Sequence, residues 1–150
     1  MLAVNDLFIG QRTHVSARYD ITWNRRTEHQ SSSGIIVSTG LGSTGWYRSV
    51  ITQAAGIAHA FLGKEFSASR LSWEDDRLTF VVREPFPSRS TRTDIVFGEI
   101  AGKDDFRILS KMSGNGVIFS DGIETDAIEF NAGTEVVIRT APRKGMLVVG

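Results

Sequence analysis

The sequence contains no cysteine, no excess of charge of either sign and no long apolar run. Without cysteine the chain can form neither a disulfide scaffold nor thiolate metal sites, and we expect a protein of the reducing cytoplasm. Its 17 basic and 17 acidic residues cancel, so charge gives no reason to expect nucleic acid or an anionic membrane as a partner. No apolar stretch approaches the roughly 20 residues that a membrane-spanning helix needs. These absences predict a soluble globular protein with one domain over residues 1–150.

Side chains for acid–base or metal chemistry are also scarce. The sequence has three histidines, and none of them stands at metal-ligand spacing from another. Ser43 is not part of a nucleophile-elbow motif, and no histidine or acid is placed to activate it. Two aspartate pairs stand in turn-like segments, where aspartate commonly bonds its own backbone, at Asp75 and Asp76 and at Asp104 and Asp105. The residues alone therefore predict no catalytic group and no metal ligand.

Most of the chain consists of short apolar segments separated by turn residues. Between residues 17 and 23 apolar and polar side chains alternate, the pattern of a strand with one buried face. The pair Asp121 and Gly122 predicts a hairpin turn, because glycine there supplies a positive φ. Other expected strands include residues 2–9, 70–73, 95–97 and 146–149. Roughly nine or ten strands with regular turn signals predict a mainly β fold, a β-sandwich or distorted barrel with one short helix.

One segment has helical periodicity instead. Between Val50 and Leu62 apolar residues recur at three- and four-residue spacing, which predicts an amphipathic helix. Gly63 follows the last of them and is typical of a helix C-terminus, whereas Gly56 inside the segment lowers its helix propensity. Because a doubly wound parallel sheet needs several crossover helices, a single helix argues against that architecture.

The segment from Gly34 to Trp46 carries the strongest functional pattern. An apolar strand at 35–37 leads into a turn with glycines at 40, 42 and 45, and the expected helix follows. Such a turn can present backbone N–H groups and a positive helix end to a phosphate or another anion. The glycine spacing also matches the dinucleotide-binding fingerprint, with Glu65 at the distance of its ribose-binding acid, but that fingerprint needs a parallel sheet. A nucleotide-binding turn in another fold, and a tight turn that uses glycine for positive φ and close packing, are the alternatives.

The pair Asn5 and Asp6 interrupts an apolar strand near the start of the chain. Both residues are poor strand formers, and adjacent residues of a strand point to opposite faces. A polar pair at this place can offer donors and acceptors to the hydroxyls of a ribose or to a base. The alternative is a β-bulge or an edge position.

Four segments together resemble the C-terminal domain of the NAD kinase family, which is β-rich. The family pattern has Asn-Glu or Asn-Asp, then Asp-Gly-hydrophobic-Ser-Thr-Pro-x-Gly-Ser-Thr-Ala-Tyr, then Phe-Asp-Gly, and finally Pro-Gly-x-x-Val-x-Ile-Arg. The corresponding segments follow one another along nearly the whole chain at residues 4–6, 34–46, 119–122 and 131–139. The specific part is Ser-Thr-x-x-Gly-Ser-Thr, which stands here from Ser38 to Thr44.

The resemblance implies a binding site for NAD. It places Asn5 and Asp6 in contact with NAD and three residues of the turn along its adenosine pocket, where glycine admits a close approach and hydroxyls can bond ribose and base. The substrate-binding residues expected from the resemblance are Asn5, Asp6, Ser33, Gly42, Ser43, Thr44, Gly45, Trp46 and Asp121.

Four residues in or next to the glycine segment depart from the family pattern. Ser33 stands where the family has an aspartate, Gly40 replaces a proline, and Gly45 and Trp46 replace Ala-Tyr. Trp46 can still stack on a base. Because Ser33 brings no carboxylate, the resemblance leaves another nucleoside, a sugar or a lipid open as the acceptor.

The Gly-Gly-Asp-Gly motif of the family is absent from these 150 residues. In the family this motif lies in a preceding α/β domain, which supplies the catalytic aspartate and approaches the ATP phosphates. The resemblance therefore implies that the intact protein uses ATP and a divalent metal, Mg, held mainly by its own N-terminal kinase domain. Phosphoryl transfer depends on positioning and on neutralising phosphate charge, so we expect the chain alone to be inactive.

The leading hypothesis is the NAD-binding domain of an NAD-kinase-like phosphotransferase, which makes NADP from ATP and NAD in the intact family. The first alternative is a non-catalytic nucleotide-binding or oligomerisation module, since family C-terminal domains contribute to subunit contacts and strand edges here can be covered by a second copy. We accordingly expect a homo-oligomer. The second alternative is a related sugar or lipid kinase domain with another acceptor.

Overall fold

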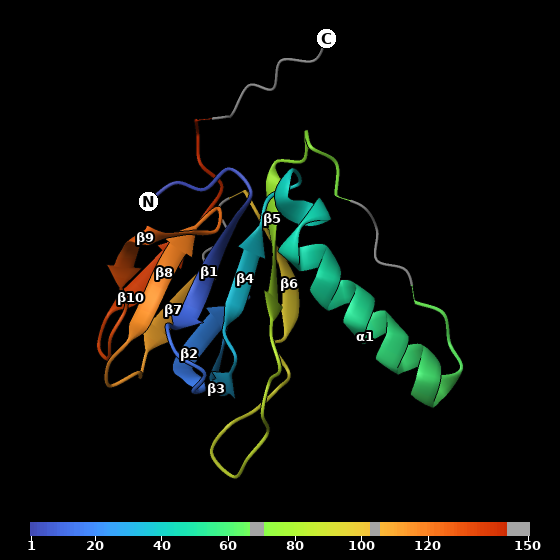
Figure 1. The fold of residues 1–150 in the computed structure, drawn as a ribbon, viewed down its shortest axis with the longest axis horizontal. Coiled ribbons are helices and arrows are strands. Elements are labelled where there is room, and N and C mark those ends of the chain that lie inside the picture. The colour runs from blue at the N-terminus through green and yellow to red at the C-terminus, as the bar shows by residue number, and fades with distance from the viewer. Residues whose placement is uncertain (67–70, 103–105, 144–150) are drawn as a thin grey trace.

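The structure, a computed structural model, describes residues 1–66, 71–102 and 106–143. Within these ranges the chain forms ten β-strands, a short 3-10 turn at Gly42–Thr44 and one α-helix, α1 (Trp46–Leu62) (Figure 1). This confirms the expected mainly β fold. The strands are β1 (Asp6–Gln11), β2 (Ala17–Trp23), β3 (Arg26–Ser32), β4 (Ile35–Ser38), β5 (Arg77–Val82), β6 (Phe97–Ala101), β7 (Phe106–Ser110), β8 (Gly116–Ser120), β9 (Ile123–Glu129) and β10 (Glu135–Ile138).

The strands form two antiparallel sheets. The six-stranded sheet has the order β6-β5-β4-β1-β8-β9, and the four-stranded sheet has the order β10-β7-β2-β3. Every strand pair of the described residues is antiparallel. The parallel βαβ unit that the dinucleotide fingerprint requires is therefore missing from the described part of the chain.

The main apolar core lies between the two sheets and contains residues from both. At its centre Phe80 of β5 stacks on Phe106 of β7, with ring centroids 4.2 Å apart. Tyr19 of β2 is completely buried there, and its hydroxyl lies 2.7 Å from Ser32 Oγ and donates to Gln30 Oε1 at 3.2 Å. Burial raises the pKa of the Tyr19 hydroxyl well above its ordinary value. The tyrosine therefore stays neutral, with its polar atom satisfied inside the core.

A second apolar cluster covers the other face of the six-stranded sheet, where α1 lies (Figure 1). Tyr47 of α1 is buried against this face, and Val50 and Ile51 are packed beside it. Burial raises the pKa of the Tyr47 hydroxyl, and the nearby Glu99 carboxylate raises it further. The first turns of α1 are therefore anchored on the sheet.

The far half of α1 leaves the sheet. Helix α1 ends as expected at Gly63, which has a left-handed φ of 61° and donates its N–H to the His59 carbonyl at 2.9 Å. Before this cap, Ile57, Phe61 and Leu62 are 53%, 84% and 68% exposed. The apolar periodicity that predicts a buried face is thus satisfied only in the first half of the helix.

Some expected strand boundaries are wrong. β1 begins at Asp6 rather than at Leu2, because the N–H groups of residues 4 and 5 bond a carboxylate instead of a neighbouring strand. Residues 71–73 form no strand, because Ser72 and Asp75 close a turn by N–H donation from Ser72 to Asp75 Oδ2 at 3.0 Å. β6 begins at Phe97, two residues later than expected. Arg70 and the expected strand 146–149 lie outside the described residues.

None of the helices in the described ranges is long and apolar enough to cross a membrane.

Candidate functional site

The carboxylate of Asp121 ties together one end of the six-stranded sheet, where β1 begins and where β4 and β8 end. It accepts hydrogen bonds from the N–H groups of Asn5 at 2.6 Å, Val4 at 3.0 Å and Asp6 at 3.2 Å. Asp121 and Gly122 have positive φ values of 54° and 74°, which confirms the expected hairpin turn between β8 and β9. The turn therefore holds the Asp121 carboxylate over the start of β1.

The segment after β4 is fixed to the same place. Thr39 Oγ1 donates to the Val4 carbonyl at 2.7 Å and accepts from the Gly42 N–H at 3.1 Å. Ser43 Oγ donates to the Gly40 carbonyl at 2.7 Å. We call this arrangement of residues 4–6, 39–45 and 121 the hydrogen-bonded knot. Its hydroxyls at 39 and 43 are used within the protein.

Close packing explains two of the three glycines of this turn. A Cβ atom on Gly42 would lie 2.0 Å from the Asn5 carbonyl oxygen, and one on Gly40 would lie 1.9 Å from the Ser72 carbonyl oxygen. Gly45 has a φ of −94°, and Gly40 and Gly42 likewise have no positive φ. The N–H groups of Ser43 and Gly45 donate to the carbonyls of Gly40 and Gly42. The turn is therefore an internal packing element, and most of its amides do not face a ligand.

Asp6 is the perturbed acid of the knot. It is half-buried, and burial raises the pKa of its carboxyl, with the neighbouring Asp121 carboxylate raising it further. Asp6 and Phe8 are two residues apart on β1, so their side chains point to the same, outer face of the sheet. The knot thus places a half-buried acid on the face that carries the second apolar cluster.

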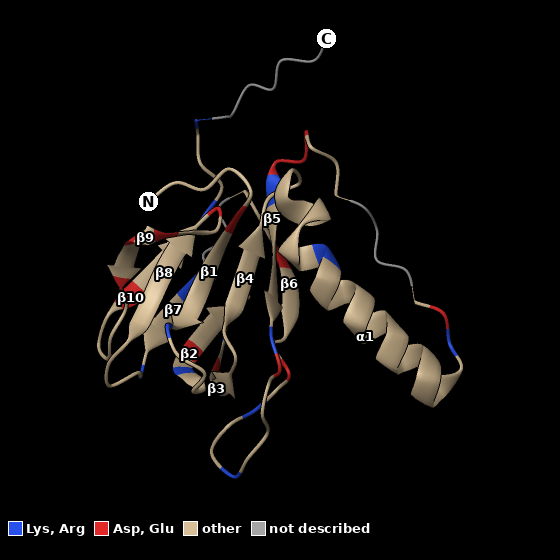
Figure 2. Ribbon diagram, viewed as in Figure 1, with Lys and Arg blue, Asp and Glu red and all other residues tan. Residues whose placement is uncertain are grey.

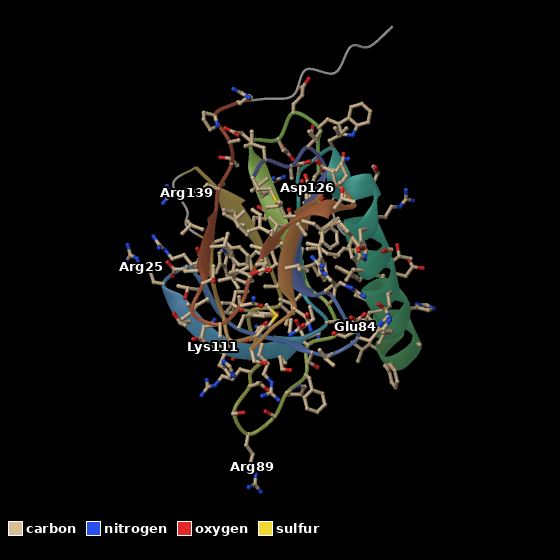
Figure 3. All side chains as sticks on the ribbon, turned by 60° about the vertical axis from the view of Figure 1, so that its left-hand side comes forward. Arg25, Glu84, Arg89, Lys111, Asp126 and Arg139 are labelled. Carbon is tan, nitrogen blue, oxygen red and sulfur yellow. The ribbon has the colours of Figure 1, made fainter. Side chains whose placement is uncertain are left out.

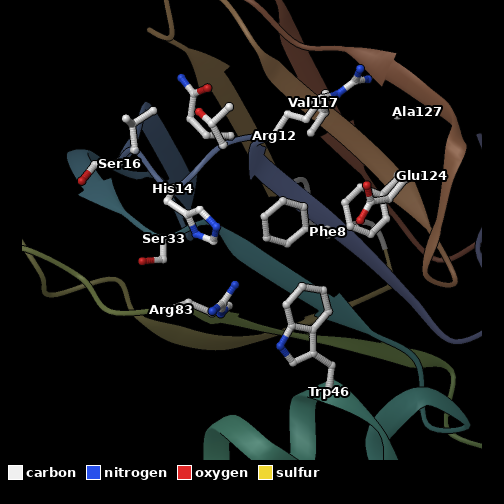
Figure 4. A pocket seen from close by; sticks show the side chains of 14 residues that line it. Phe8, Arg12, His14, Ser16, Ser33, Trp46, Arg83, Val117, Glu124 and Ala127 are labelled. Atoms are coloured by element: carbon white, nitrogen blue, oxygen red, sulfur yellow. The ribbon is translucent and has the colours of Figure 1, made fainter.

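A pocket of about 350 Å³ opens on this outer face (Figure 4). Phe8 of β1 forms its floor and lies between two other rings, with centroids 4.9 Å from Phe119 and 5.3 Å from Trp46. Phe8 and Phe119 are cross-strand partners, and Trp46 is the first residue of α1. The remaining lining residues are Gln11, Arg12, Thr13, His14, Val15, Ser16, Ser33, Arg83, Val117, Glu124 and Ala127. We call this the aromatic pocket.

The aromatic pocket has two arginines and one acid on its walls. Arg83, which follows β5, places its guanidinium 5.0 Å from the ring centroid of Trp46, a cation–π distance. Arg12 follows β1, and Glu124 stands on β9 across the pocket (Figure 4). The formal charge of these three side chains is positive, whereas the whole chain is neutral.

The sequence-predicted site residues divide between these two places. Ser33 and Trp46 line the aromatic pocket. The other seven belong to the knot, which adjoins the pocket through Trp46: Asn5, Asp6, Gly42, Ser43, Thr44, Gly45 and Asp121. Among them Thr44 is exposed, and it does not line the pocket. The predicted residues therefore lie together around the start of α1, but most of them contact other segments of the protein's own backbone.

Sequence reasoning missed the residues that make up most of the pocket. Phe8, Phe119 and Arg83 come from three strands or strand ends that are distant in sequence. The apolar segments around the two phenylalanines predict strands, but only the pairing of β1 with β8 brings the rings together. Among the described residues no three side chains of His, Asp or Glu gather as a metal site. The described part therefore offers no side-chain cluster for the metal, which the resemblance assigns mainly to the N-terminal domain of the intact protein.

The geometry defines a two-sheet antiparallel β domain with an aromatic pocket of about 350 Å³ at the start of its helix. The sequence matches no protein-family model and no curated protein. In structure the chain is similar to an NAD kinase from Archaeoglobus fulgidus in complex with ATP, with a TM-score of 0.62 and 14% identity over 95% of this chain and 47% of that one. It is also similar to yeast NADH kinase complexed with NADH, with a TM-score of 0.61 and 19% identity over 90% of this chain and 33% of that one.

At these identities the likeness establishes the fold, so the chain is NAD-kinase-like in its architecture. It spans about half the length of the first protein and a third of the second. The expected resemblance to a NAD kinase domain is thus confirmed at the level of the fold.

Proposed function

We propose that the chain is the NAD-binding domain of an NAD-kinase-like phosphotransferase. The observation that carries the proposal is the position of the knot beside the aromatic pocket, in a chain with the fold of two nucleotide-bound kinases. NAD consists of two nucleosides joined by a pyrophosphate, so it needs stacking surface for a ring and polar groups for a ribose. The pocket offers the first, and Asn5, Asp6 and Thr44 at the knot offer the second.

The knot contributes rigidity to this function. Its hydrogen bonds fix the start of β1 and the entry to α1, so Asn5 and Trp46 are held in place before a ligand arrives. Preorganisation of this kind lowers the entropy cost of binding. ATP, Mg and the catalytic aspartate belong, in this proposal, to another part of the intact protein, and the chain supplies the acceptor.

The test is a calorimetric titration of the chain with NAD+. Replacing Asn5 by Ala, or Thr44 by Val, removes a polar group from the proposed ribose contacts, and each should weaken binding about fivefold. Thr52→Val is the matched control, because Thr52 is exposed on α1 and its hydroxyl donates to the Arg48 carbonyl of its own helix at 2.8 Å. Binding that is absent at millimolar NAD+, or equal in all four proteins, would contradict the proposal. A tighter fit to a nucleoside, sugar or lipid acceptor would favour the related kinase alternative.

A second candidate function is self-association, and the far half of α1 favours it. This helix carries Arg48 as its one Lys or Arg and contains no Asp or Glu (Figure 2). Ile57, Phe61 and Leu62 are exposed on it, and such a surface is typical of a contact with another protein. Sedimentation velocity over a range of concentrations tests the expected homo-oligomer. A monomer at every concentration would exclude association through this helix.

A further inference from the structure

The aromatic pocket has a chemical character that NAD binding in general does not require. Its floor is three rings wide, because Phe8 lies between Phe119 and Trp46. Its volume of about 350 Å³ is near the lower end of the roughly 300–1,000 Å³ of small-molecule sites. A flat ring with a short polar substituent suits such a space better than a whole dinucleotide does.

The backbone sets a cation beside this floor. The Ser33 N–H donates to the Arg83 carbonyl at 2.9 Å, and the Arg83 N–H donates to the Gly34 carbonyl at 2.8 Å. These two hydrogen bonds extend the pairing of β4 with β5 and fix Arg83 next to Ser33. The Arg83 side chain is 26% exposed, and its guanidinium lies over the Trp46 ring. The position of Arg83 is therefore determined by the sheet and not by a flexible loop.

Positive side chains outnumber acidic ones in the lining of the aromatic pocket. The carboxylate neighbour of Arg83 is Glu84, at 3.5 Å, and half of the Glu84 side chain is exposed. Within the pocket Arg12 adds a second positive charge, and Glu124 is the one acid of the lining. Ser33 stands at the position where the resembling family has an aspartate. A serine there adds no carboxylate to the pocket lining beside Arg83; Ser33, Arg83 and Arg12 are shown in Figure 4.

We propose that the aromatic pocket binds the phosphorylated end of a nucleotide, with the ring on the Phe8, Phe119 and Trp46 floor and the phosphate on Arg83 and Arg12. This inference rests on the proposed nucleotide-binding function and assigns its specificity to Arg83. Guanidinium groups bind phosphate through two parallel N–H···O bonds, which are among the stronger hydrogen bonds of proteins. Aromatic side chains accept any base, because every base has a π-face. Arg83 therefore selects for charge, whereas the floor selects only for a ring.

The experiment compares adenosine with adenosine 5′-monophosphate, which carry the same ring and differ in charge. Each is titrated into the chain by calorimetry at low and at high salt. We expect the monophosphate to bind at least about tenfold more tightly than adenosine at low salt. The preference should shrink at high salt, because ions screen a partly exposed charge pair.

Three variants test which arginine causes the preference for the monophosphate over adenosine. In Arg83→Gln it should fall to near unity, and in Arg83→Lys part of it should return because the charge is kept without the planar fork. Arg12→Gln should reduce it by a smaller factor, and this variant leaves the cation–π contact with Trp46 intact. Arg89→Gln is the control, because it removes the same charge from the exposed loop between β5 and β6, where Arg89 points away from the body (Figure 3).

The two proposals can fail separately. Equal affinities for adenosine and its monophosphate, a preference that survives in Arg83→Gln, or no binding of either compound would overturn the pocket assignment. None of these results depends on Asn5 or Thr44, which decide the NAD+ titration. The preference for the monophosphate can depend on Arg83 while NAD+ binding does not change in the Asn5 and Thr44 variants. That result would support the pocket assignment and contradict the proposed NAD-binding role.

Discussion

The knot and the aromatic pocket lie at neighbouring places on one sheet, yet they use their side chains in opposite ways. In the knot, Asp121 and Thr39 form hydrogen bonds with backbone groups of other segments. Glycine is needed at position 42 because the Asn5 carbonyl leaves no room for a Cβ atom there. In the pocket, the Phe8 ring and the Arg83 guanidinium line a space of about 350 Å³. Most residues with the recognisable sequence pattern therefore build the architecture, while Phe8 and Arg83, which line the pocket, come from a strand and a strand end that carry no motif.

This contrast separates stability from binding. Changes to the knot residues that hold the backbone, Gly42 and Asp121, should alter the free energy of unfolding, whereas changes in the pocket should alter affinity with little loss of stability. Substitutions at the knot and on the far half of α1 test this separation.

Gly42→Ala should have the largest effect. The new Cβ would lie 2.0 Å from the Asn5 carbonyl oxygen, so the turn and the start of β1 must separate. We expect a loss of about 3 kcal/mol in the free energy of unfolding, measured with urea. Gly56→Ala is the matched control, because a Cβ there meets nothing within 4 Å, and it should stabilise α1 by about 0.5–1 kcal/mol. Equal effects of the two changes would show that the knot is not closely packed.

Asp121→Ala should cost less, about 2 kcal/mol, because three N–H groups lose a charged acceptor but can reach water. Asp121→Asn keeps one acceptor oxygen and should recover part of that loss. Asp126→Ala serves as the control, since Asp126 is an exposed acid on β9 (Figure 3). If denaturant unfolding gave the same midpoint for Asp121→Ala and Asp126→Ala, the carboxylate would not hold the start of β1.

Asp6→Asn should stabilise the protein slightly at neutral pH. The folded pKa of Asp6 is raised above its ordinary value of 3.8, so the folded state binds more protons than the unfolded state between these two pKa values. The Asp6 contribution to stability is therefore most favourable at low pH and declines as pH rises through the folded pKa. We expect a gain of less than about 1 kcal/mol at pH 7, which disappears below about pH 4. Unfolding measured from pH 3 to 7 checks this, and a variant less stable than wild type at pH 7 would contradict it.

Phe61→Ser should change stability least, within about 0.5 kcal/mol. The Phe61 side chain is 84% exposed, so the folded monomer loses little contact. Its effect should appear instead in sedimentation, where a self-associating chain would become more monomeric. A large loss of stability would mean that the far half of α1 is packed in the molecule in solution.

The fold was largely predictable from local chemistry. The end of α1 at Gly63 and the hairpin at Asp121 and Gly122 both follow from glycine in a left-handed conformation, which a sequence displays directly. The strand at 71–73 was wrongly predicted, because the Asp75 carboxylate turns the chain at Ser72. A side-chain-to-backbone bond of this kind is not visible in an apolar pattern.

The candidate site was predictable only in part. Trp46 and Ser33 follow from the glycine segment, and both line the pocket. Arg83 could not be predicted, because it comes next to Ser33 only through the register of β4 with β5. Strand register depends on the whole sheet, whereas a motif reports only on its own segment.

A crystal structure of the chain grown with NAD+ would test the proposed NAD-binding site most directly. We expect one ring of the dinucleotide against Trp46 and Phe8, and a ribose within hydrogen-bond distance of Asn5 or Thr44. Density for NAD+ at another surface, or an empty pocket in crystals grown at saturating NAD+, would contradict it.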